Sequence, residues 1–170
     1  PRATFVDAVP VLDALRAVKS PAEIELMRRA AVLNAESLAV VLEGGREGDS
    51  TAKVARAVER EMRLRDLHHL YALVCAGPSW FRAPSERQRW QRDGVLHVDT
   101  AGMLEGSIAE LCRTAVLGTP SDLADRMLAG CRALEAAVLP SPEIPPSLLL
   151  DVPAAPGDVL EVREDLEKRA

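Results

Sequence analysis

The chain has 170 residues, enough for one domain with its own core, and 48% of them are hydrophobic, which excludes a disordered tail. Its formal net charge of -5 argues against a nucleic-acid-binding protein, because such proteins usually carry a basic balance. No apolar run reaches the about 20 residues of a membrane span, and no signal peptide pattern is visible. We therefore expect a cytoplasmic protein with neither nucleic acid nor membrane as a partner.

The cysteines and the first residue give two further expectations. Cys75, Cys112 and Cys131 are an odd number without CxxC spacing, so they form neither a disulfide framework nor a zinc knuckle. We expect reduced thiols, as in other cytosolic proteins. Because the chain begins at Pro1 rather than Met, we expect a fragment or a processed chain.

The N-terminal part predicts a short strand followed by a long helix. Residues 5–15 resemble a short strand and a connection. Ser20 and Glu23 form a capping box around Pro21, which is a clear helix start. The two glycines at 44–45 end this helix.

A second helix and a buried strand follow. Asp49, Ser50 or Thr51 caps the helix, whose apolar stripe has helical spacing. Residues 69–76 read as a buried strand, and residues 80–91 form a polar loop.

The second half predicts a hairpin, a helix and two short strands. Strands over residues 95–100 and 107–117 are antiparallel, because only a turn at residues 102–106 connects them. A capped helix begins after Thr119-Pro120, and short strands are predicted at 148–152 and 159–162. Helices beside an antiparallel sheet indicate the α+β class.

Asp99 and Glu110 are the first candidates for chemistry. Each lies in an apolar strand, where a carboxylate is costly unless it is paired or metal-bound. Carboxylates on one face of neighbouring strands suit Mn, Co or Zn, and a two-metal site polarises water for attack on an amide. The alternative is one salt bridge, for example between Glu110 and an arginine. His97 shares the face of Asp99, where it either ligates one metal or, as we expect, is packed or hydrogen-bonded.

The polar loop leaves two interpretations open. Trp80 and Trp90 stand in it beside Arg82 and further arginines. Exposed Trp and Arg are typical interface anchors, so these residues form either a binding rim or a loop tied to the core by its tryptophans.

Two segments resemble a known family. The run LRAVKSPAEIELMR (Leu15–Arg28) is similar to the domain-start pattern "LRxIKSPxEIxLMR" of the creatinase / aminopeptidase P / methionine aminopeptidase-like, or pita-bread, metallopeptidases. Residues 94–118 resemble the family's hairpin "GDxVxxDxGxxxxGYxSDxTRTxxxG". The resemblance implies an α+β pita-bread fold over residues 1–170, with helices on a curved, mainly antiparallel sheet. Residues 1–14 belong either to this domain or to the end of a preceding domain or linker.

The resemblance also implies an activity. Family members cleave amino-terminal residues or Xaa-Pro bonds, or hydrolyse creatine-like amidines. They use two divalent metal ions (Mn, Co or Zn), and two of the ligands fall on Asp99 and Glu110 here. A peptide or small amide substrate follows from the same resemblance.

The departures from the family pattern indicate an internal deletion and a degraded metal site. No Gly-His-Gly segment supplies the family's His ligand, and the residues at 80–84 lack its substrate-side His. The family's ligand Glu falls on Arg163, while Glu164 is one residue off and faces the other way on a strand. The chain then holds either the family's metals or none. It is either a hydrolase domain with an incomplete site, a non-catalytic domain that binds peptides or proteins, or a dimerising structural fragment. An uncovered part of the sheet favours a homodimer.

Overall fold

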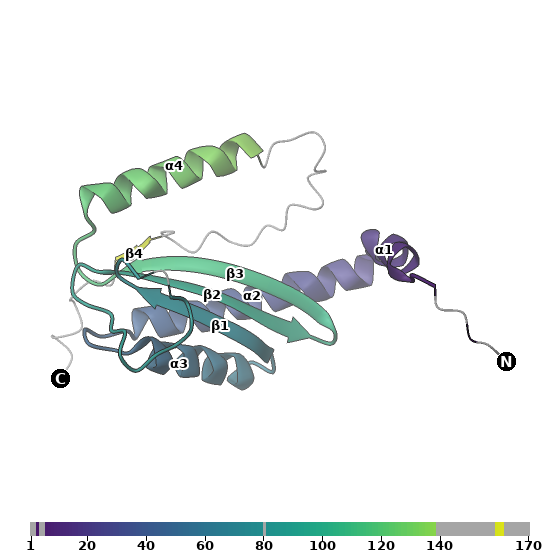
Figure 1. Cartoon of the computed structure of the whole chain (residues 1–170), viewed down its shortest axis with the longest axis horizontal. Helices are drawn as coiled ribbons and strands as arrows, with labels where there is room; N and C mark the ends of the chain where they lie inside the picture. Colours follow the sequence, from purple (N-terminus) through teal and green to yellow (C-terminus); the bar gives the residue numbers. More distant parts are fainter. Residues whose placement is uncertain (1–2, 4–5, 80, 139–158, 162–170) are drawn as a thin grey trace.

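Helices cover one face of an antiparallel sheet in this computed structural model, which describes residues 3, 6–79, 81–138 and 159–161 (Figure 1). The α+β class predicted from the sequence is confirmed. The elements are, in order, α1 (Val9–Ala17), α2 (Pro21–Glu43), α3 (Thr51–Leu64), β1 (His68–Ala76), β2 (Val95–Leu104), β3 (Ser107–Val116), α4 (Asp122–Val138) and β4 (Val159–Glu161).

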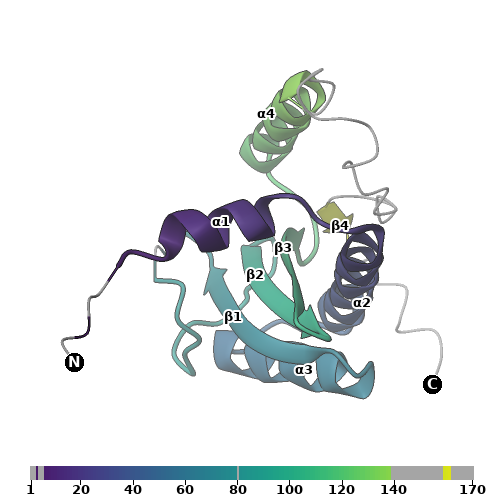
Figure 2. The same ribbon diagram turned by 90° about the vertical axis from the view of Figure 1, so that its right-hand side faces the viewer.

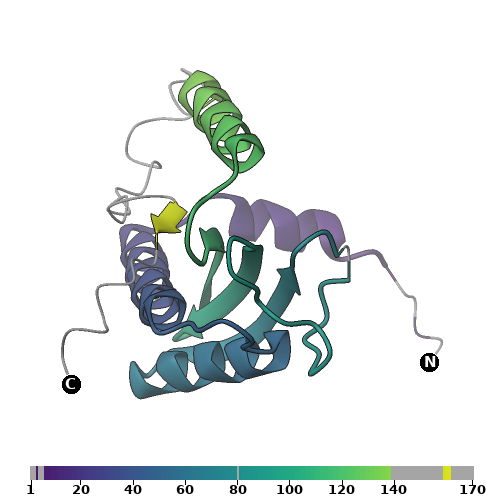
Figure 3. The ribbon, with the colours of Figure 1, turned by 90° about the vertical axis from the view of Figure 1, so that its left-hand side faces the viewer.

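The capping signals of α2 and α3 form as the sequence predicts. The Ser20 amide donates to the Glu23 carboxylate over 2.7 Å, and the Glu23 amide donates to Ser20 Oγ over 3.3 Å. Ser50 caps α3 by accepting from the Lys53 amide at 3.0 Å. Both helices pack on the same face of the sheet, as the end-on views show (Figures 2 and 3). The core lies between them and includes Leu38, Leu42, Val58, Met62, Val74, Leu96 and Val98.

The sheet has the strand order β1-β2-β3-β4. β1, β2 and β3 are antiparallel neighbours, and β4 pairs with β3 in parallel. This agrees with the expected mainly antiparallel sheet. β4 lies within the predicted strand at 159–162, whereas the predicted strand at 148–152 falls outside the described residues.

The hairpin between β2 and β3 is tighter than predicted. β2 continues to Leu104, and the turn is Glu105-Gly106, with φ of 48° and 84°. Two successive left-handed residues give the turn that matches the twist of a hairpin. Gly102 suggested an earlier turn, but it is a packing site, because a Cβ there would lie 2.4 Å from Leu67 Cδ2.

The strand predicted within residues 5–15 is wrong over its described part, which contains helix α1. The three valines at 6, 9 and 11 suggested a strand. Pro10 instead occupies the first helical turn, and the Val9 amide donates to Asp7 Oδ1 over 2.9 Å. No residue of α1 is buried, so local propensity decides its conformation, and residues 12–17 are rich in good helix formers.

α4 stands away from the sheet, on the side opposite α3 (Figures 1 and 2). Its predicted cap forms, since the Ala124 amide donates to Ser121 Oγ over 3.2 Å. Leu123 and Met127, on its apolar face, are 58% and 63% exposed. Within the described part of the chain, no helix combines the length and apolarity needed to cross a membrane.

Candidate functional site on the open face of the sheet

The face of the sheet away from α2 and α3 carries the predicted carboxylates. Leu96, Val98 and Thr100 of β2 are completely buried toward the helices, so the alternating residues point to the other face. Asp99 and Glu110 therefore lie on one face, in neighbouring rows. The strand register sets three rows there: Tyr71, Ala101 and Glu110; Leu73, Asp99 and Cys112; and Cys75, His97 and Thr114.

Asp99 is held by two protein groups. Arg82, from the loop between β1 and β2, forms an ion pair with Asp99 through Nη2. The Asp99 side chain is only 16% exposed and that of Arg82 45% exposed. Burial raises the pKa of the Cys112 thiol, and the hydrogen bond that this thiol donates to Asp99 raises it further. The sequence analysis gave a salt bridge to an arginine as the alternative to a metal site, with Glu110 as the example. The structure has such a salt bridge at Asp99 instead.

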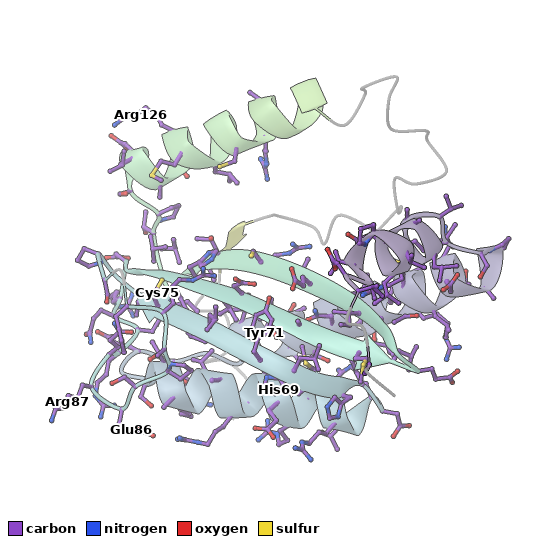
Figure 4. All side chains as sticks on the ribbon, turned by 45° about the vertical axis from the view of Figure 1, so that its right-hand side comes forward. His69, Tyr71, Cys75, Glu86, Arg87 and Arg126 are labelled. Carbon is purple, nitrogen blue, oxygen red and sulfur yellow. The ribbon has the colours of Figure 1, made fainter. Side chains whose placement is uncertain are left out.

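Glu110 is engaged by Tyr71. The Tyr71 hydroxyl donates a hydrogen bond to Glu110. Burial, this bond and the nearby charge of Asp99 together raise the pKa of Tyr71 to about 12. Figure 4 shows Tyr71 and Cys75 on the open side of β1, and His69 on the side of α3.

His97 lies beside the ion pair and is hydrogen-bonded within the sheet. Its Nδ1 is 3.2 Å from Thr114 Oγ1. Burial lowers the pKa of His97, Arg82 lowers it further, and Asp99 acts in the opposite direction. This arrangement corresponds to the hydrogen-bonded alternative.

The loop that carries Arg82 is fixed to the start of α3. The Thr51 amide donates to the Gln88 carbonyl, and the Ser85 amide donates to Thr51 Oγ1, each over 2.9 Å. The Arg82 carbonyl accepts from the Val74 amide of β1 at 2.7 Å. The backbone of Arg82 is therefore tied to the edge of the sheet, with its guanidinium over Asp99.

Trp90 is an anchor of this loop and not part of an exposed rim, so the rim interpretation is wrong for this residue. Its side chain is completely buried, and its Nε1 donates to the Gly94 carbonyl over 2.8 Å. The indole packs on Gly45, where a Cβ would lie 2.3 Å from Trp90 Cζ3. Trp80 lies outside the described residues.

The described residues do not fit a two-metal centre. Within residues 3, 6–79, 81–138 and 159–161, no three His, Cys, Asp or Glu side chains come together so that they could hold a metal ion. Asp99 is paired with Arg82, and Glu110 accepts from Tyr71. Arg163 and Glu164 lie outside the described part.

Comparison with known proteins establishes the family. Residues 25–144, more than half of the chain, match the model of metallopeptidase family M24. This chain therefore belongs to metallopeptidase family M24, as the hairpin and the domain-start segment led us to expect. Members of the family generally use divalent metal ions.

Three relatives illustrate the relationship. The uncharacterized hydrolase/peptidase y4tL of Sinorhizobium fredii is 30% identical over 134 residues, which cover 72% of this chain and 33% of that protein. The dipeptidase PepE of Mycobacterium ulcerans has a TM-score of 0.68 and 29% identity, over 77% of this chain and 37% of its own. A prolidase from Thermococcus sibiricus has a TM-score of 0.69 and 23% identity, over 76% and 37% of the two chains. The chain thus spans about a third of the length of these relatives and shares their pita-bread fold over that part.

Proposed function

We propose that this chain is a peptide-binding domain of metallopeptidase family M24 with a degraded metal site. The observation that carries the proposal is the ion pair between Arg82 and Asp99, which occupies the first of the family's ligand positions. Glu110, at the second position, already accepts a hydrogen bond from Tyr71. Two carboxylates that are both engaged leave a divalent ion without the oxygen ligands that it needs.

Peptide binding is supported by the family and by the chemistry of the open face. The relatives include proteins named as a dipeptidase and a prolidase. Glu110 is exposed, and Arg82 is about half exposed, so the face offers charges of both signs. Half-buried Leu73 and Cys75 lie beside them and offer apolar surface. A short peptide presents the complementary set of charged termini and apolar side chains.

The proposal is tested by measuring binding and cleavage of Xaa-Pro peptides in parallel. Isothermal titration calorimetry of Ala-Pro and longer Xaa-Pro peptides, with EDTA and then with Mn²⁺, Co²⁺ or Zn²⁺, gives the affinity. Chromatography of the same mixtures after long incubation detects hydrolysis. We expect binding with the same affinity in EDTA and in metal, and no cleavage.

A matched pair of variants places the binding on the open face. Glu110→Ala removes an exposed charge from this face and should weaken peptide binding, while Arg87→Ala changes a side chain that points away from the sheet (Figure 4) and should leave it unchanged. Equal effects of the two substitutions, or the absence of any peptide binding, would contradict the proposal.

The second candidate function is metal-dependent hydrolysis of Xaa-Pro peptides. The observation that favours it is that Asp99 and Glu110 share one face, as a bridging pair of ligands must. Cleavage that requires Mn²⁺, Co²⁺ or Zn²⁺ in the experiment above would select this function over the binding domain.

We also propose that the chain forms a homodimer. The proposal is supported by exposed apolar side chains on two helices, namely Leu12 and Leu15 of α1 and Leu123 and Met127 of α4. Light scattering coupled to size exclusion over a range of concentrations should give twice the chain mass. The paired substitutions Leu123→Glu and Met127→Glu should shift the mass toward a monomer, and a monomeric mass for the unsubstituted chain at all concentrations would refute the proposal.

A further inference from the structure

Asp99 is a largely enclosed charge on the open face. Its side chain is 16% exposed and lies in the row between Leu73 of β1 and Cys112 of β3. An isolated carboxylate in such surroundings is unfavourable unless a cation or hydrogen-bond donors compensate it. In this chain the compensating cation is a side chain of the same molecule, the guanidinium of Arg82.

Arg82 reaches Asp99 from a backbone that is fixed at several points. Its own carbonyl accepts from the Val74 amide, and the next part of the loop is bound to Thr51 at the start of α3. Because the backbone is already ordered by these contacts, the ion pair requires ordering of little more than the Arg82 side chain. Pre-organisation of this kind favours the internal cation over an ion from solution.

From this geometry we infer that Arg82 is a built-in cation that excludes divalent metal ions from Asp99. The inference deepens the proposed function and rests on it, because it names the element that keeps the site free of metal. A divalent ion would have to displace the guanidinium from the carboxylate. It would then lie beside a positive charge that the fixed loop keeps nearby, and the two like charges would repel.

Removing the charge of Arg82 should create a weak metal site. Asp99 and Glu110 stand diagonally across β2 and β3, since Asp99 is opposite Cys112 and Glu110 is opposite Ala101. The Cα atoms of diagonal neighbours on one face of a sheet lie about 7–8 Å apart. Two carboxylate side chains at this spacing can approach one ion. Hard oxygen donors of this kind suit Mn²⁺.

The test is Mn²⁺ binding to the full chain, measured by equilibrium dialysis without peptide. Arg82→Gln keeps a polar side chain, although a shorter one, and removes its charge, and Arg82→Ala is a second, independent variant. Arg87→Ala is the matched control, because Arg87 lies in the same loop and points away from the sheet (Figure 4). We expect both Arg82 variants to bind Mn²⁺ at least about tenfold more tightly than the unsubstituted chain, since a repelling charge is gone. Arg87→Ala should bind like the unsubstituted chain.

Adding Asp99→Asn to Arg82→Gln assigns the site. The double variant should lose the gained affinity, while Asp99→Asn alone should leave Mn²⁺ binding unchanged. Circular dichroism melting curves show that each variant is folded before it is titrated. Equal Mn²⁺ affinity of folded Arg82 variants and the unsubstituted chain would overturn the inference, and so would a gain that persists in the double variant. If the chain bound no peptide, the proposed function would be refuted. The comparison of Mn²⁺ affinities between the Arg82 variants and the unsubstituted chain would still test the present inference.

Discussion

Arg82 and Asp99 form an ion pair that joins the loop between β1 and β2 to the open face of the sheet. Asp99 stands where the family resemblance puts the first metal ligand, so the pair bears on both stability and function. We propose that the Arg82 guanidinium takes the place of a metal ion at this carboxylate. The loop anchors at Thr51 and Val74 explain why this charge stays there.

The ion pair should contribute little to stability. Because the Arg82 side chain is 45% exposed, water and salt screen the interaction, and pairs of this kind are worth about 0.2–1 kcal/mol. A double-mutant cycle with Arg82→Ala and Asp99→Asn, measured by urea unfolding, should give a coupling energy in this range. A coupling well above it would mean that the pair is far more shielded from water than the exposure of Arg82 indicates.

Tyr71 should titrate far above a free tyrosine. It is the only tyrosine of the chain, so absorbance at the tyrosinate band reports on it alone. The expected midpoint is about 12, and Glu110→Ala should lower it by removing the hydrogen bond and a nearby charge. Since the unfolded chain ionises near the ordinary pKa of 10.0, the contribution of Tyr71 to stability should fall as the pH rises from there toward the folded value. A midpoint near 10 in the folded chain would contradict this account of Tyr71.

His69 should make the fold less stable in mild acid. Its Nε2 is buried and, among the described residues, finds no hydrogen-bond partner. Burial lowers its pKa below 6.5, Arg63 and His68 lower it further, and Glu59 acts in the opposite direction. As the pH falls below 6.5, the unfolded state therefore binds a proton that the folded state resists, and the free energy of unfolding decreases.

Replacing His69 by Phe should reduce the dependence of the free energy of unfolding on pH in mild acid. Urea unfolding at a series of pH values between about 5 and 7 measures the slope for the variant and for the unsubstituted chain. Arg87→Ala is the control, because Arg87 is exposed and is not among the groups that shift the pKa of His69. The account of His69 fails if both substitutions leave the slope as it was.

Trp90→Ala should lower the free energy of unfolding by about 3–5 kcal/mol, the usual loss for a buried tryptophan. Gly45→Ala should also destabilise the fold, because its Cβ would overlap the Trp90 ring. Gly130→Ala in α4 is the matched control. A Cβ there meets nothing within 4 Å, and alanine favours a helix by about 1 kcal/mol. Equal unfolding midpoints for the two glycine variants would show that Trp90 does not press on Gly45.

The sequence predicted an element correctly where its conformation depends only on residues close by in the chain. Ser20 and Ser50 begin helices through caps that involve only residues three positions away, so the helix starts could be recognised. α1 was missed because its valines suggested a strand, although its proline favours a first helical turn. The turn was placed early because Gly102 serves packing against Leu67, a contact from outside the hairpin.

The shared face of Asp99 and Glu110 follows from the two-residue period of a strand and a tight turn, so it could be predicted. The partners of these two residues could not be predicted in the same way. A register shift in β1 between His69 and Tyr71 puts these residues on opposite faces and brings Tyr71 to Glu110. Arg82 reaches Asp99 because the loop is bound to α3, a contact between segments far apart in the sequence.

The most direct test of the central claim is anomalous diffraction from crystals of the chain soaked in MnCl2. We predict that Arg82 remains on Asp99 and that no manganese peak appears between Asp99 and Glu110. A strong peak coordinated by both carboxylates, with the Arg82 guanidinium displaced into solvent, would contradict the claim that a side chain of this protein takes the place of the metal.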